Sequence, residues 1–422
     1  MSLPTPAEFA SSAICYPAVH PADGVRMRLT LTRSPGGIMN DQPYLESPRR
    51  ARPDELDAIL ALANEVMRIE QGRQPTIATD YPFIYNRKNV ENITVVMQDQ
   101  ATDGELAVSM VGAWMNTVAV GDVRLRAGGI NCLATLTGYR GQGLATQVMG
   151  AAVEHLAELG CHVGRLTTGI NNWYHRLGWE NAGTLCTYRF NHSNVGLLPT
   201  LPRELEVTHG TEFHDEVISA IVSLHQSDQL GGSRTAEIMR DLLAADSDPN
   251  LMGNKRYVIA RQAGTPVAYC LDSNHGIIEW GGLPEVIAGL VRTWFGSKVG
   301  TRGGQLTPGL QEKVADSPEL TLVAPAEGHP FIDLLRSLAL PCREDYWGML
   351  YIIDPGGILA AFGLTEIAVS EEAGKFTLTR GSESLSVSRQ ELAKLLFGPE
   401  RISDFASDVL PLLFWEWPIE HV

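Results

Sequence analysis

The sequence predicts an α/β fold of two or three domains, and three observations lead to this expectation. The chain has 422 residues, more than one ordinary core needs. Strand-like apolar runs alternate with runs whose apolar residues recur at the helical period. The order of these elements returns in weaker form from about residue 200. We therefore expect domains at 1–195, 200–353 and 354–422.

The first stretch contains two helix-like runs, several strands and a glycine-rich turn between them. Gly121-Asp122 is typical of a hairpin turn, and Gly160 is suited to a left-handed helix end. In chain order, we expect a helix from Leu56 to Val66, strands at 93–97, 106–118, 123–125 and 130–136, a helix at 144–159 and a strand at 162–167.

A polar segment with two prolines, 191–202, separates this stretch from the next. The last stretch reads as a small α+β module: a helix at 355–361, three short strands and a helix at 389–396. In the middle stretch, between residues 202 and 354, we expect a helix at 213–224, strands at 257–261, 266–271 and 276–280, a helix at 286–295, a strand at 320–324, a helix at 331–338 and a strand at 347–353.

Composition excludes several classes of function. The net charge of −16 opposes non-specific nucleic-acid binding and is compatible with a cationic substrate. The six cysteines form no CxxC pair and the 11 histidines form no HExxH, so we expect no metal site. Dispersed cysteines, the absence of a long apolar run and the absence of a secretory signal favour a cytoplasmic protein with no membrane span.

The segment Arg140-Gly141-Gln142-Gly143-Leu144-Ala145 lies between an apolar strand and an amphipathic helix. A diphosphate needs unpaired backbone N–H donors, and a helix N-terminus supplies them together with the positive end of its dipole. Glycines allow the backbone to approach phosphate oxygens, and an arginine adds a charged donor. An ordinary strand–turn–helix with glycines for geometry is the structural alternative for this pattern alone.

This turn matches the Arg/Gln-x-x-Gly-x-Gly/Ala pyrophosphate motif of the GNAT superfamily of acetyltransferases. About 30 residues later, Trp173-Tyr174-His175-Arg176-Leu177-Gly178-Trp179 resembles the aromatic-Tyr-x-x-x-Gly-aromatic segment of that family. The resemblance implies a GNAT fold, with a mixed, splayed central sheet flanked by helices, and acetyl-CoA as cosubstrate.

The resemblance also implies roles for single residues. Tyr174 would act as the general acid that protonates the leaving thiolate, while a primary amine attacks the thioester directly. A core tyrosine with a satisfied hydroxyl is the structural alternative. The residues implied to bind acetyl-CoA are Leu133, Ala134 and Thr135 on the splayed strand, for pantetheine, and Arg140, Gly141, Gln142, Gly143, Leu144 and Ala145 in the turn, for the diphosphate.

The strand before the turn, 130–136, has no carboxylate to serve as the base that many family members place there. Cys132 has no evident histidine partner and reads as a buried thiol. The whole plan resembles the enhanced intracellular survival (Eis) family, which joins two GNAT domains to a sterol-carrier-like domain. In that family the terminal carboxylate is the base, so the resemblance implies Val422, with His421 and Glu420 as alternatives.

The second copy has Gly281-Gly282-Leu283-Pro284 in place of the phosphate turn, without a matching arginine. We expect the second copy to have a structural role in packing, to shape the substrate cleft and to form an oligomer contact. The predicted acceptor is a small cationic amine or a lysine. Two other functions fit the chain: a non-catalytic acyl-CoA sensor, because the strand lacks a Glu, and a lipid-binding carrier built on the last module.

Overall fold

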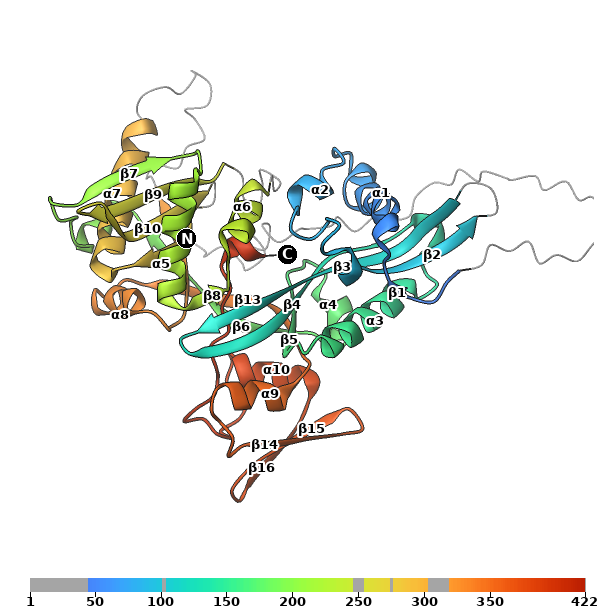
Figure 1. The fold of residues 1–422 in the computed structure, drawn as a ribbon. Coiled ribbons are helices and arrows are strands. Elements are labelled where there is room, and N and C mark those ends of the chain that lie inside the picture. Colours follow the sequence, from blue (N-terminus) through green and yellow to red (C-terminus); the bar gives the residue numbers. More distant parts are fainter. Residues whose placement is uncertain (1–44, 101–103, 246–253, 274–275, 303–318, 422) are drawn as a thin grey trace, which may run out of the picture.

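The computed structural model describes residues 45–421 apart from 101–103, 246–253, 274–275 and 303–318. Two α/β halves lie side by side, and a smaller module projects from beneath them (Figure 1). The predicted fold class, a mixed sheet flanked by helices, is confirmed. In the described part of the chain, every helix falls short of the length and apolarity that crossing a membrane requires.

The first half begins with a short edge strand and two helices and continues into a long antiparallel ribbon. Its elements are β1 (Arg49–Arg50), α1 (Leu56–Met67), α2 (Ile77–Asp80), β2 (Thr94–Gln100), β3 (Gly104–Val120) and β4 (Val123–Thr135). The predicted hairpin turn is present, and Gly121 in it has a φ of 57°. The elements that complete this half are α3 (Leu144–Glu158), β5 (Val163–Leu166), α4 (Asn171–His175) and β6 (Glu180–Phe190).

In this half β1, α2, α4 and β6 were not predicted, and one strand boundary was predicted wrongly. The residues 126–129 read as a break between two strands, but β4 is continuous through them. Gly128 is a glycine because α3 packs against it: a Cβ there would lie 2.4 Å from a methyl carbon of Leu156. A glycine inside a strand can mark such a close approach, so it need not end the strand.

The second half contains every predicted helix and strand. Its elements are β7 (Glu206–Gly210), α5 (Asp215–Asp228), β8 (Leu230–Gly232), α6 (Ala236–Ala244), β9 (Arg256–Gln262), β10 (Thr265–Ser273), β11 (Gly276–Gly282), α7 (Pro284–Arg302), β12 (Leu320–Pro325), α8 (Pro330–Ser337) and β13 (Cys342–Ile352). Among these, β7, β8 and α6 were not predicted.

The two halves share one sheet rather than two. The strand order is β1-β2-β3-β4-β5-β13-β6-β12-β11-β10-β9-β7, with β8 added to the edge of β3. Strand β13 from the second half therefore lies between β5 and β6 of the first, and it pairs antiparallel with both. Strand β6 in turn pairs with β12. The halves are joined through backbone hydrogen bonds at this seam.

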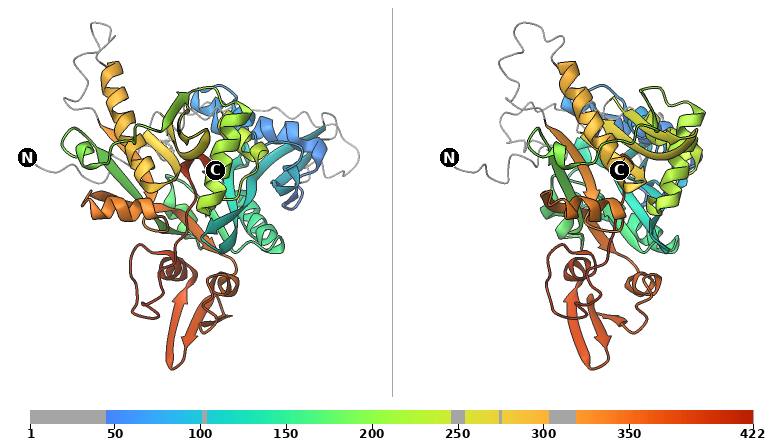
Figure 2. Two further views of the ribbon diagram at one scale, coloured as in Figure 1. Left: turned by 60° about the vertical axis from the view of Figure 1, so that its left-hand side comes forward. Right: turned by 90° about the vertical axis from the view of Figure 1, so that its left-hand side faces the viewer.

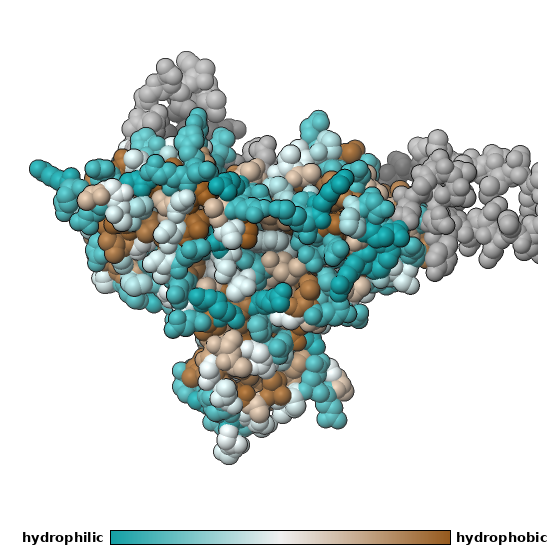
Figure 3. Space-filling view, in the orientation of Figure 1, coloured by the Kyte–Doolittle hydropathy of each residue, from teal (hydrophilic) through white to brown (hydrophobic). Residues whose placement is uncertain are grey.

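The last module contains α9 (Pro355–Ala361), a separate antiparallel sheet of β14 (Ala368–Glu372), β15 (Lys375–Arg380) and β16 (Glu383–Ser388), and α10 (Arg389–Phe397). Its helices begin at side-chain caps, since Asp354 accepts a hydrogen bond from the Gly357 N–H and Ser388 one from the Glu391 N–H. Two further views show the module projecting below both halves (Figure 2). Apolar side chains gather on the part of the visible face over this module (Figure 3).

After α10 the chain turns back and ends between the two halves (Figure 1). We call residues 414–421 the tail. Phe414, Trp415 and Trp417 in it are almost completely buried. The Trp417 ring packs edge-on against Trp280 of β11, with 5.1 Å between ring centroids, and its Nε1 donates to the Leu230 carbonyl at 3.0 Å. The tail is thus part of the core that both halves share.

Candidate active site

Strands β4 and β5 pair over three residues and then separate, as expected for a splayed sheet. They pair in parallel from Ala127 to Gly129, and the last pair joins Gly129 to Arg165. Beyond it β4 continues to Thr135 in contact with β3, while β5 pairs with β13 on its other side. Within the described residues, Leu133, Ala134 and Thr135 therefore lie on a part of β4 that has left β5. A strand that has left its neighbour has backbone groups available to a ligand.

The pairing of β4 with β3 is irregular at the same place. The register shifts between Met110 and Gly112, opposite Cys132 and Leu133, which is a β-bulge. Cys132 there has a φ of 46°, a strained value for a residue with a Cβ. Burial raises the pKa of the Cys132 thiol to about 11, although a hydrogen bond with Tyr85 lowers it in part. The thiol is therefore neutral at pH 7 and unsuited to nucleophilic attack.

The glycine-rich turn leads directly into α3. Gly141 and Gly143 both have a φ of 78°, which glycine adopts without strain. No side chain caps the N-terminus of α3 at Gly143, and a Cβ built at Gly141 would meet no atom within 4 Å among the described residues. Gln142 is exposed, whereas Leu144 is buried and fixes the helix to the sheet. In the described part of the chain, the turn therefore leaves the N-terminus of α3 without a side-chain cap.

Arg140 has a partner that local sequence patterns did not indicate. Its Nη2 lies 2.6 Å from a carboxylate oxygen of Glu70, and its Nε donates to the Thr135 carbonyl at 3.0 Å. The other Glu70 oxygen accepts from the Thr137 hydroxyl at 2.6 Å. Burial tends to raise the Glu70 pKa, but these two bonds outweigh it and lower the pKa. Glu70, from the segment after α1, therefore holds the two ends of the segment from Thr137 to Arg140 through its two carboxylate oxygens.

Tyr174 lies on α4, directly after β5, and is buried with 7% of its surface exposed. Its ring packs edge-on against Trp173 and Trp179, with centroids 4.9 and 6.3 Å away. The same apolar cluster contains Leu144 and Val148 of α3, and Leu133 packs against it. The structure thus brings the tyrosine, the start of α3 and the splayed part of β4 onto one side of the sheet.

The tail lies on the opposite side of the sheet, among the side chains that include Trp114 and Trp347. Arg165 of β5 is fully buried, and its guanidinium lies over the Trp114 ring at 5.5 Å. Its Nε is 2.5 Å from Glu416 Oε2, and its Nη1 donates to the Glu420 carbonyl at 3.3 Å. Arg165 belongs to the last pair before β4 and β5 separate. Its side chain therefore holds the tail next to the point of separation.

Glu420 is held by the second half. Its carboxylate accepts from Arg234 Nε at 2.8 Å, from the Trp417 N–H at 2.8 Å and from the Gly232 N–H at 3.1 Å. Burial tends to raise its pKa, but the Arg234 charge and these bonds lower it. Arg234 Nη1 also donates to both carboxylate oxygens of Glu279, at 2.8 and 2.9 Å. A carboxylate with this many donors serves structure, which disfavours Glu420 as a catalytic base.

His421 packs edge-on against Trp347, with 5.0 Å between ring centroids. Burial and the neighbouring Arg165 charge lower the His421 pKa to about 4, so its ring is neutral at pH 7. Among the described residues, its Nε2 has no hydrogen-bond partner. Val422, the predicted base, lies outside the described residues.

The corresponding turn of the second half differs in what surrounds its glycines. The Gly282 N–H donates to an Asp228 carboxylate oxygen at 2.8 Å. A Cβ on Gly281 would lie 2.5 Å from that same oxygen, and one on Gly282 would lie 2.2 Å from the Val267 carbonyl. The chain's own atoms and a negative charge fill this turn, which therefore suits a phosphate poorly.

Comparisons with known proteins agree with this geometry. Residues 47–182 match the family model of the acetyltransferase (GNAT) domain. The first half therefore contains a GNAT acetyltransferase domain. The match includes the splayed strand, the glycine turn and Tyr174. No curated protein matches the chain significantly.

Solved structures resemble nearly the whole chain, at low sequence identity. A probable N-acyltransferase from Enterococcus faecalis is 13% identical, with a TM-score of 0.57 over 87% of this chain and 93% of its own. A GCN5-related N-acetyltransferase from Anabaena variabilis is 14% identical, with a TM-score of 0.54 over 84% and 90%. Eis1 from Mycobacterium abscessus is 12% identical, with a TM-score of 0.51 over 85% and 90%. At these identities the likeness shows the fold.

Proposed function

We propose that the protein is an N-acetyltransferase that transfers the acetyl group of acetyl-CoA directly to a primary amine. The observation that supports this most is the uncapped N-terminus of α3 behind two glycines at φ 78°, beside a strand that has left its neighbour. In this proposal the backbone of Leu133, Ala134 and Thr135 pairs with pantetheine. The segment from Arg140 to Ala145 holds the diphosphate, as in the family it resembles.

The chemistry in this proposal has one acid and one base. The amine attacks the thioester carbon, a tetrahedral intermediate forms, and its collapse breaks the C–S bond. Tyr174 gives its phenolic proton to the leaving CoA thiolate, and backbone N–H groups of β4 stabilise the oxyanion. The base removes the proton that the amine must lose. The terminal carboxylate of Val422 is the proposed base. The alternative base is the His421 imidazole, which is neutral because its pKa is lowered.

The acceptor in this proposal is a small cationic molecule or a lysine, in line with the net charge of −16. The second half (200–353) binds no CoA, because Asp228 fills its turn. Instead it holds the tail through Arg234. The module at 354–422 returns the chain end to the first domain (1–195), and its likeness to a sterol carrier stays a prediction.

The proposal is tested by CoA thiol release from acetyl-CoA against a panel of polyamines, aminoglycosides and lysine peptides. We expect turnover with at least one amine, and a Gly143→Ala variant should raise the KM for acetyl-CoA by about tenfold with a smaller effect on kcat. The reason is that a Cβ at φ 78° costs about 1–2 kcal/mol in the loop that binds the diphosphate. Gly150→Ala is the matched control, since Gly150 is exposed on α3 and no atom of the described residues lies within 4 Å of an added Cβ. Equal KM values in the two variants would argue against this loop as the diphosphate site.

Two further variants separate the candidate bases. A chain that ends at His421 keeps Glu420 and its network but moves the terminal carboxylate by one residue. We expect its kcat to fall by more than about tenfold with unchanged CoA affinity, within the range for loss of general base catalysis. If His421→Ala loses activity and the shortened chain keeps it, the base is the imidazole.

A further inference from the structure

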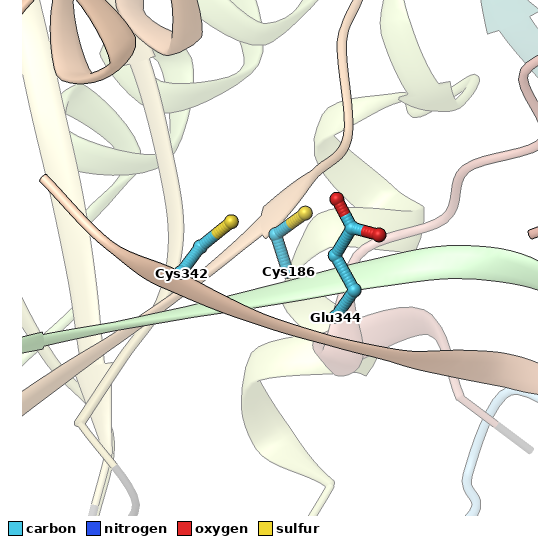
Figure 4. A group of neighbouring side chains, drawn as sticks. All are labelled: Cys186, Cys342 and Glu344. Carbon is cyan, nitrogen blue, oxygen red and sulfur yellow. The ribbon is translucent and has the colours of Figure 1, made fainter. Parts of the chain in front are cut away.

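A cluster of two thiols and a carboxylate lies on the seam between the two halves, away from the site described above. Cys186 is on β6, and Cys342 and Glu344 are on β13. In the antiparallel register Glu344 stands directly opposite Cys186, and Cys342 stands two positions along the same strand. All three side chains therefore project from the same face of the sheet, toward one another (Figure 4).

The three side chains offer ligand atoms at the spacing of one metal ion. The two Sγ atoms and a carboxylate oxygen all lie within 4.8 Å of one another. Bonds of about 2.3 Å from zinc to sulfur and about 2.0–2.2 Å from zinc to oxygen would place ligand atoms roughly 3.5–4 Å apart around a single ion. Small rotations of exposed or half-buried side chains are enough to reach that spacing, and Glu344 is exposed while Cys342 is half-buried.

The charges of the cluster also favour a cation. The Glu344 carboxylate is an anionic ligand, and cysteines bind a metal ion as thiolates. Thiolates that lie this close to a carboxylate need a positive charge to balance them. A divalent cation supplies that balance and releases the thiol protons to solvent on binding. The exposed side of Glu344 provides the entry path.

From this geometry we propose that Cys186, Cys342 and Glu344 bind a soft divalent metal ion such as Zn²⁺ or Cd²⁺. Two thiolates select such ions over Mg²⁺ and Ca²⁺, which prefer oxygen ligands. Three protein ligands leave a fourth position for water. Because β6 belongs to the first half and β13 to the second, the ion cross-links the two halves across their shared sheet. The short spacings by which metal sites are found in sequences do not reveal it, since the cysteines are about 150 residues apart.

The test is titration of the reduced, metal-free full chain with Cd²⁺, read by the ultraviolet charge-transfer absorption of cadmium–thiolate bonds. We expect one equivalent to bind with a Kd of roughly 10 µM or tighter. Cys342→Ser should weaken binding by about 100-fold and reduce the band, and Glu344→Gln should weaken it by about tenfold while keeping most of the band. Cys161→Ser, which removes a buried thiol of the first half, should leave both unchanged.

A second measurement covers the case of a variant that folds poorly. Saturating Zn²⁺ should raise the Tm of the wild type and of Cys161→Ser, and it should raise that of Glu344→Gln less, because a ligand of the folded state stabilises it. No charge-transfer band at one equivalent, or a band that survives unchanged in Cys342→Ser, would overturn the metal site. Neither outcome depends on acetyl transfer, so the proposed function is judged separately.

Discussion

Replacing Tyr174 with phenylalanine is expected to lower kcat for amine acetylation by about 10²–10⁴-fold, the usual contribution of a positioned general acid. The ring is buried against Trp173 and Trp179, and phenylalanine keeps these edge-on contacts. The loss should therefore fall on kcat, with the Kd for CoA changed by less than about threefold. Initial rates at saturating acetyl-CoA, together with CoA binding by calorimetry, measure both quantities.

Two comparisons make the Tyr174 result specific. Tyr351→Phe is the control, because Tyr351 packs on the same Trp179 ring from β13 and has no proposed role in catalysis. Its kcat should stay within about twofold of the wild type. The proposal also predicts that a thioester with a more acidic leaving thiol rescues Tyr174→Phe, since such a thiolate needs no proton. Full activity of Tyr174→Phe at all pH values would remove the tyrosine from the mechanism.

Replacing Glu420 with alanine is expected to lower the free energy of unfolding by about 3–5 kcal/mol, the usual cost of breaking a buried ion pair from one side. The substitution leaves Arg234 Nε and the N–H groups of Gly232 and Trp417 buried without their acceptor. Urea unfolding of both proteins measures the difference. Glu372→Ala, at an exposed position of β14, is the control and should change stability by less than about 0.5 kcal/mol.

The same residue predicts a pH dependence. The Glu420 pKa is lowered in the folded protein, so its contribution to stability is present above the ordinary carboxylate pKa of 4.5. It is lost as the pH falls from there toward the folded value. The difference in stability between wild type and Glu420→Ala should accordingly shrink as the pH falls below about 4.5. A Glu420→Ala variant within about 1 kcal/mol of the wild type at pH 7 would mean that the tail contributes little to joining the halves.

The features that local patterns determine were predictable from the sequence. The turn from Arg140 to Ala145 is one of them: Gly141 and Gly143 adopt positive φ values that glycine favours, and α3 begins at Leu144 as expected. The longer helices and most strands followed from apolar periodicity, whereas the strands β6, β7 and β8 and the short helices α2, α4 and α6 were not predicted. The break expected at 126–129 is absent, and Gly128 there marks the close contact with Leu156 of α3.

The features that depend on distant partners were not predictable. Nothing near Arg140 in the chain points to Glu70, because their contact forms only when the segment after α1 packs beside the turn. The same holds for the arginines that bind the tail, Arg165 and Arg234, which lie on separate halves. The insertion of β13 between β5 and β6 also left no local pattern, because it depends on strands that are distant in the sequence.

The most direct test of the central claim is a single-turnover experiment. Protein in excess over acetyl-CoA is mixed with the best amine of the panel, and acetylated amine, free CoA and acetylated protein are followed by mass spectrometry. Direct transfer predicts acetylated amine and CoA appearing together in equal amounts, with no acetylated protein at any time. Acetyl-CoA that binds but stays intact with every amine, or an acetyl group that appears first on the protein, would contradict the account.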